Sequence, residues 1–114
     1  MNNKNEIILF DIINSDSAET PEVGDKVYKI LITKIDECIN KDTKLIISFD
    51  KIKNITSAFL NNALGRLFFK YDWEKLISTL VFTGFTNNNQ ISTLKFTLTN
   101  AKLLSKNKKI LDVK

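Results

Sequence analysis

The sequence predicts an α/β domain with a mostly parallel or mixed sheet and helices packed against it. Short apolar runs rich in β-branched residues, at 6–13, 43–50 and 78–85, are typical of strands. A stretch with helical periodicity follows each run, and this alternation favours strands joined by helices. The length of 114 residues suits one hydrophobic core, so we expect a single domain over residues 1–114.

The first half of the chain begins with the strand "EIILFDII" at 6–13. The polar stretch 14–24 holds the only proline and is expected to be a loop, in which either Thr20 or Asp25 could cap the following helix. That helix is predicted at 25–40, because its apolar residues share one broad arc. The arc comprises Val27, Tyr28, Ile30, Leu31, Ile35, Cys38 and Ile39. Its position in the arc makes Cys38 a small core residue.

The middle of the chain predicts a central strand followed by a helix. The run at 43–50 is continuously apolar over Leu45–Phe49, which is typical of a strand buried in the middle of a sheet. Residues 57–71 have helical periodicity, and one stripe should face the sheet with Phe59 and Phe68 flanking it. The stripe comprises Leu60, Ala63, Leu64, Leu67 and Tyr71.

The last third predicts a third buried strand at 78–85 and a helix at 89–104. Ile91, Leu94, Leu98 and Ala101 lie on one helical stripe, but residues 92–99 also alternate with period two, so helix and strand both remain open there. A basic tail at about 105–114 follows, and we expect it to be anchored by its apolar residues. These are Ile110, Leu111 and Val113.

The charge is distributed unevenly. Residues 1–50 contain 6 Lys against 10 Asp and Glu, whereas residues 51–114 contain 11 Lys and Arg against 3 acidic residues. Arg66 is the only arginine, and a lysine-dominated surface lacks the planar fork that reads bases bidentately. A lysine-rich nucleic-acid-binding domain is therefore an alternative rather than the main interpretation.

The sequence contains few of the residue types on which enzyme active sites usually depend. The chain has no histidine, one cysteine and three isolated glycines, which excludes the usual general base and a glycine-rich phosphate loop. Asp72 and Glu74 are two residues apart, so on a helix they point to different faces, and we interpret them as capping or solvated residues. We expect no enzymatic activity, no catalytic residue, no cofactor and no metal.

The same composition predicts a cytoplasmic protein without a membrane partner. No apolar run approaches the roughly 20 residues of a membrane-spanning helix. The N-terminus lacks the pattern of a signal peptide, and a single cysteine fits a reducing compartment.

The helix at 57–71 also has a candidate partner face. Opposite the apolar stripe lie Ala58, Asn62, Gly65 and Phe69, with Arg66 beside them. Small residues next to an aromatic ring form a shallow groove, and a glycine in mid-helix indicates a close approach. The groove could accept a protein partner, or another helix of the same domain could cover it.

The segment "LIISFDKIKNITSAFLNNALGRLF" at 45–69 resembles the STAS-like family of unknown function, which is related to the STAS domains of bacterial anti-sigma factor antagonists. The family's acidic residue at the end of the strand falls on Ser48 here. The resemblance implies a STAS-like domain and a non-catalytic regulatory module that binds a histidine-kinase-like ATPase. A small structural homo-oligomer remains a further alternative.

The resemblance also points to phosphorylation at the start of this helix, although the acidic residue of the phosphorylated antagonists falls on Ile55 or Thr56 in this sequence. In phosphorylated antagonists an Asp-Ser-Ser-Gly segment opens the helix, and it falls near Thr56, Ser57, Ala58 and Phe59. Depending on register, the modified serine corresponds to Ser57 or to Ala58, so Ser57 and Thr56 are the candidate phosphorylation sites. A phosphate is tolerated at a helix N-terminus, but either hydroxyl could equally serve only as the N-cap.

Overall fold

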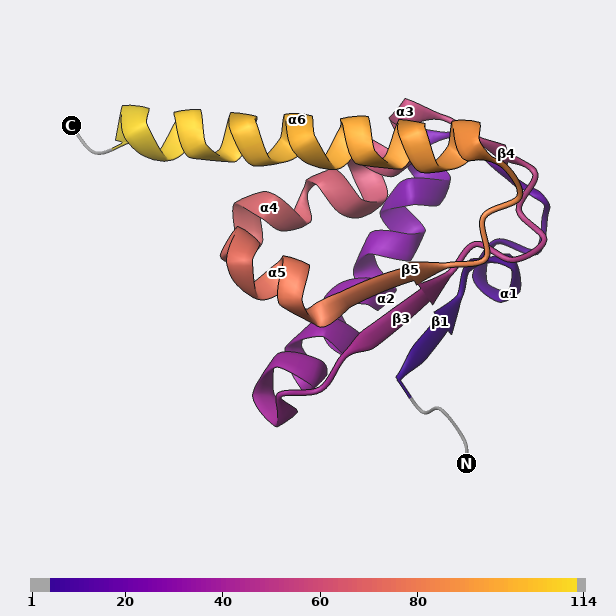
Figure 1. Cartoon of the computed structure of the whole chain (residues 1–114), viewed down its shortest axis with the longest axis horizontal. Coiled ribbons are helices and arrows are strands. Elements are labelled where there is room, and N and C mark those ends of the chain that lie inside the picture. Colours follow the sequence, from indigo (N-terminus) through magenta and orange to yellow (C-terminus); the bar gives the residue numbers. More distant parts are fainter. Residues whose placement is uncertain (1–4, 113–114) are drawn as a thin grey trace.

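The fold is built on a parallel three-stranded sheet in the order β1-β3-β5. The computed structural model describes residues 5–112, with side chains described through Lys106. The strands are β1 (Glu6–Ile8), β3 (Leu45–Ser48) and β5 (Leu80–Thr83), and β3 is central. Helices join the strands (Figure 1), so the predicted α/β class and the central strand are confirmed.

The predicted strand at 6–13 is wrong beyond Ile8. Only Glu6 to Ile8 pair with β3, opposite Ile46 to Ser48. The chain then turns into α1 (Leu9–Ile13), which ends at Asn14 in the left-handed conformation. Because β3 ends at Ser48, residues beyond Ile8 have no strand to pair with, and a helical turn satisfies their backbone groups instead.

The long helix α2 (Pro21–Lys41) begins four residues earlier than predicted. Thr20 is its N-cap and accepts a hydrogen bond from the amide of Val23. Of the two residues predicted as caps, Thr20 and Asp25, the structure therefore uses Thr20. Cys38 is buried, as predicted. Ile30, however, is 38% exposed, since the buried arc is narrower than the sequence predicts.

One face of the sheet is covered and the other is open. Leu45, Ile47 and Phe49 point to the covered face and are fully buried. Ile46 lies on the other face, beside Glu6 and Val81 of the neighbouring strands, and is only half-buried. The central strand therefore does not have two equally buried faces.

A second, two-stranded parallel sheet interrupts the predicted loop at 14–24. It pairs β2 (Ser17–Ala18) with β4 (Asn54–Ile55). The predicted loop also ends at Pro21, where α2 begins. This small sheet brings Glu19 next to Thr56, at the start of the helix that begins at Ser57.

Residues 57–70 form one helical segment with an irregular centre. It comprises α3 (Ser57–Leu60), the π-helical turn η1 (Asn61–Gly65) and α4 (Leu67–Lys70). Leu60, Ala63, Leu64 and Leu67 are buried, as are Phe59 and Phe68. Tyr71 is half-buried instead, and its hydroxyl donates to Asp36 Oδ1 at 2.5 Å on α2.

The predicted buried strand at 78–85 is shorter, and it lies at the edge of the sheet. Helix α5 (Trp73–Thr79) occupies its first residues, and Asp72 is the N-cap that accepts from the amide of Lys75. The interpretation of Asp72 as a capping residue is thus confirmed. Along β5, Val81 and Thr83 are exposed, while Leu80 and Phe82 are half-buried.

Residues 92–99, for which the sequence left both helix and strand open, are helical and belong to α6 (Asn88–Asp112). Leu94 and Ala101 are buried, while Ile91 and Leu98 are half-buried, as the predicted stripe requires. The helix runs across α3 and α4 (Figure 1) and continues through most of the predicted tail. The expected anchors Ile110, Leu111 and Val113 lie outside the described side chains. In residues 5–112 no helix has the length and apolarity to cross a membrane.

Candidate partner-binding site

The start of the helical segment 57–70 separates the two candidate hydroxyls. Thr56 is the N-cap: its Oγ1 accepts from the amide of Phe59 at 3.2 Å and donates to the carbonyl of Glu19 at 2.5 Å. Ser57 is the first helical residue and is exposed. Among the described residues, none forms a hydrogen bond with its hydroxyl. The cap and the accessible hydroxyl are therefore different residues.

Two of the five predicted partner residues contribute to internal packing. Asn62 donates through Nδ2 to the carbonyl of Pro21 at 2.6 Å, which joins η1 to the start of α2. Gly65 is buried, and a Cβ there would lie 3.7 Å from Cβ of Ala101 on α6. For Gly65, the alternative of coverage by another helix of the domain is the one that the structure shows.

Coverage by α6 explains why Gly65 is not free on the outward face, although the segment also contains a π turn. Arg66 donates its amide to the carbonyl of Asn61 at 3.2 Å, five residues back rather than four. Such a turn holds one more residue than an α-helical turn, so every later side chain is rotated relative to a regular wheel. Even so, the regular wheel predicted the burial of Leu60 and Leu67 and the exposure of Phe69 on the two sides of the turn.

The remaining three residues, Ala58, Arg66 and Phe69, are exposed. Phe69 keeps 51% of its surface accessible. With Tyr28, Arg66 and Lys70 it lines an open hollow of about 560 Å³, and we call these four residues the Phe69 surface. Ala58 lies at the other end of the same helical segment.

Arg66 is held in place from α2. Its Nη1 lies 2.7 Å from Oδ1 of Asp25, and its guanidinium carbon lies 3.9 Å from the centre of the Tyr28 ring. Lys29 approaches the other carboxylate oxygen at 3.3 Å. The hydrogen bond from Arg66, followed by that from Lys29, lowers the pKa of Asp25 from its ordinary value. Ion pair and ring stacking together fix the guanidinium beside Phe69.

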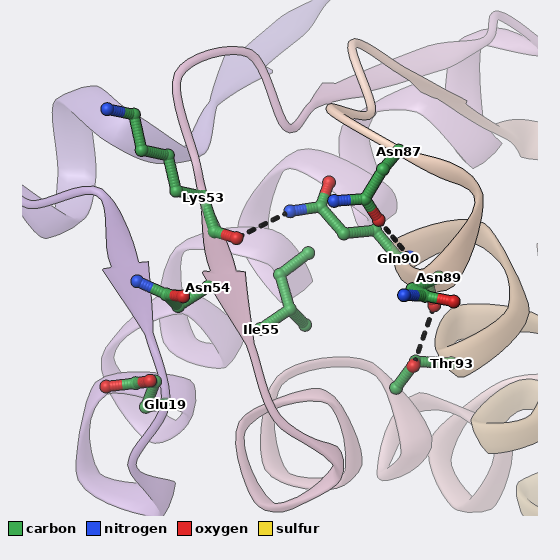
Figure 2. A pocket seen from close by; sticks show the side chains of 8 residues that line it. All are labelled: Glu19, Lys53, Asn54, Ile55, Asn87, Asn89, Gln90 and Thr93. Carbon is green, nitrogen blue, oxygen red and sulfur yellow. Dashed lines mark hydrogen bonds between the residues drawn. The ribbon is translucent and has the colours of Figure 1, made fainter.

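A polar hollow of about 260 Å³ lies between β4 and the start of α6 (Figure 2). Its central residue is Gln90, which is buried and was not singled out from the sequence. Gln90 Nε2 donates to the carbonyls of Ile52 and Lys53 at 3.0 and 3.1 Å, and its Oε1 accepts from the amide of Thr86. Asn87 caps α6 by accepting from the amide of Gln90. These bonds join α6 to the 52–53 segment and use both hydrogens of the Gln90 side-chain amide.

Ser48 and the residue types that bind metals were also considered from the sequence. Ser48, at the position of the family's acidic residue, is buried and accepts from the amide of Asp50 at 3.2 Å. Among the side chains that the structure describes, through Lys106, there is no group of three His, Cys, Asp or Glu residues that could hold a metal ion.

The central strand β3 is thus followed, after β4, by a helix that Thr56 caps and whose first residue, Ser57, has an exposed hydroxyl. Residues 24–90 match the model of the family described as a STAS-like domain of unknown function (DUF4325), and the chain belongs to that family. Neither the curated proteins nor the solved structures compared with this chain give a significant match.

Proposed function

We propose that this chain is a non-catalytic regulatory module that binds a protein partner through the Phe69 surface. The observation that carries this proposal is the ring of Phe69, 51% exposed beside a fixed arginine in an open hollow. Aromatic and arginine side chains dominate the binding energy of protein interfaces, and a positioned arginine loses little conformational freedom on binding. Family resemblance makes a histidine-kinase-like ATPase the expected partner, in the cytoplasm.

Phosphorylation of Ser57 is the proposed switch. The hydroxyl is exposed, and Thr56 supplies the cap independently, so a phosphate on Ser57 leaves the cap in place. The phosphate adds about −1.5 to −2 charges at a helix N-terminus, where the free amides and the helix dipole tolerate an anion. The modified module therefore stays folded but presents a different charge at the end of the segment that carries Phe69.

Site-specific photocrosslinking in cells tests the interaction surface. A photoreactive amino acid replaces Phe69 in one variant and Phe96, which is 66% exposed on α6, in the control. We expect a discrete adduct from position 69 that mass spectrometry identifies as an ATPase, and none from position 96. Adducts of equal yield from both positions, or none from position 69, would contradict the proposed surface.

Affinity for the purified partner then separates the surface from the switch. Phe69→Lys should keep the melting temperature within a few degrees and weaken binding by at least tenfold. Ser57→Asp should also fold normally and bind more weakly than Ser57→Ala, because only the first introduces charge. Wild-type affinity for Ser57→Asp and for phosphorylated protein would remove the switch and leave the surface intact.

A further inference from the structure

An apolar cavity of about 230 Å³ lies where the helical segment 57–70, α5, β5 and α6 meet. Its walls include Leu67 and Phe68 of α4, Leu76 and Ile77 of α5, Phe82 of β5 and Leu98 of α6. Leu67 and Leu76 are fully buried and form the inner end, whereas Ile77 is 53% exposed and marks the opening. The cavity thus passes from the core to the surface.

The apolar lining of this cavity, rather than its volume, distinguishes it from the polar hollow beside Gln90. Protein interiors contain few voids larger than a water molecule, and an unfilled void destabilises the fold. An engineered apolar cavity of about 150 Å³ stays dry and binds benzene. A cavity of 230 Å³ with purely apolar lining residues is therefore suited to a small apolar group rather than to water.

The opening leads to a second hollow that carries a positive charge. This hollow, of about 290 Å³, shares Phe68, Ile77 and Leu98 with the cavity and adds Trp73, Thr99 and Lys102. Nζ of Lys102 lies 3.6 Å from the centre of the Trp73 ring, a cation–π contact that holds the ammonium at the opening. Neither hollow is lined by a described acidic side chain, so an anionic group meets no charge repulsion there.

We propose that the two hollows bind one medium-chain carboxylic acid, with its alkyl chain in the cavity and its carboxylate on Lys102. Ligand pockets for drug-sized molecules are about 300–1,000 Å³, so the inner cavity is too small for a long acyl chain. The apolar interior and the ammonium of Lys102 at the opening match the two ends of such a molecule. No residue of this site belongs to the Phe69 surface, so the proposal stands apart from partner binding.

Calorimetric titration of the full chain with hexanoate, octanoate and decanoate tests the alkyl-chain half of the proposal. Burial of a CH₂ group contributes enough free energy for about a fourfold gain in affinity. We expect this gain for each added carbon until the cavity is full, with a melting temperature that rises with ligand concentration. Affinity that does not change with chain length would overturn the proposal.

Lys102→Met tests the carboxylate half, because it removes the charge and keeps an apolar stem. Lys95→Met, an exposed position on the same helix, is the matched control. Lys102→Met should weaken octanoate at least fivefold and leave 1-octanol unchanged, while Lys95→Met should bind both like wild type. Equal loss in both variants would show non-specific attraction to a basic helix and overturn the site.

Leu98→Trp, which places a larger ring in both hollows, should abolish binding of octanoate and octanol alike while its circular dichroism stays native. If that variant fails to fold, methyl NMR of the wild type decides, because octanoate must shift the methyl signals of Leu76 and Ile77. Shifts confined to residues outside the cavity would reject the proposal. The proposal would also be rejected if the ligand-free protein were a dimer that Ile77→Lys dissociates, because the cavity would then be covered by a second copy of the chain.

Discussion

Gly24 of α2 and Phe59 of α3 approach so closely that a Cβ on Gly24 would lie 2.7 Å from the carbonyl oxygen of Phe59. The same atom would lie 2.9 Å from Cβ of Asn62. The nearest atom to this Cβ would be a backbone oxygen, which cannot move aside by a side-chain rotation. Room for the Cβ would require one of the two helices to shift as a whole. The absence of a side chain at position 24 therefore sets how closely α2 packs against the segment 57–70.

Gly24→Ala should consequently lower the free energy of unfolding by about 1–3 kcal/mol, the usual effect of overpacking. Gly65→Ala is the control, because a Cβ there meets only ordinary contacts of 3.5 Å or more. Since alanine has the higher helix propensity, Gly65→Ala should be neutral or stabilise by up to about 1 kcal/mol. Urea denaturation measures both, and an equal loss in the two variants would refute the packing argument.

The two faces of the central strand should respond differently to a charge. Ile47→Asp places a carboxylate in the covered core and should lower the free energy of unfolding by several kcal/mol. Ile46→Asp changes the half-buried face and should have a clearly smaller effect. The sequence predicts both isoleucines on a strand buried in the middle of the sheet, whereas the structure buries only Ile47 fully. Similar melting temperatures for the two variants would show that the open face is covered in solution.

The N-cap assignment predicts that alanine substitutions at the adjacent residues Thr56 and Ser57 change the stability of the protein by different amounts. Thr56→Ala removes the cap and the bond to Glu19, so we expect a loss of about 0.5–2 kcal/mol. Ser57→Ala should change the free energy of unfolding by less than about 0.5 kcal/mol, since it is an exposed site without a described bond. Chemical denaturation of the two variants decides, and a larger loss for Ser57→Ala would reverse the assignment.

The ion pair of Asp25 with Arg66 predicts a pH-dependent contribution to stability. A carboxyl whose pKa is lowered by folding stabilises the native state above its unfolded pKa, and this contribution disappears as pH falls through the folded pKa. Wild type should therefore melt higher than Asp25→Asn at pH 7, and the difference should shrink below about pH 4, the ordinary range of Asp. Added salt should shrink it too, because the pair is at the surface. A difference that persists unchanged at pH 2 would point to packing instead of charge.

Local sequence signals determined the α/β class, the central strand and the presence of most helices, because periodicity and capping chemistry are properties of neighbouring residues. The run at Leu45–Phe49 was predicted on that basis, and the structure contains it as β3. Thr20 was one of two predicted caps for α2, although the helix itself was predicted only from residue 25, and the stripe on α6 was predicted with a strand as the alternative. The resemblance at 45–69 likewise indicated the family that residues 24–90 match.

Tertiary structure alone decided where strands end and which helix faces are free. Residues after Ile8 have strand propensity, but β3 offers them no partner and they form α1. Gly65 lies on the outward side of a regular wheel, but α6 crosses the segment there and Ala101 packs against it. Pairing and helix contacts join residues far apart in the chain, so no window of neighbouring residues contains the information that determines them.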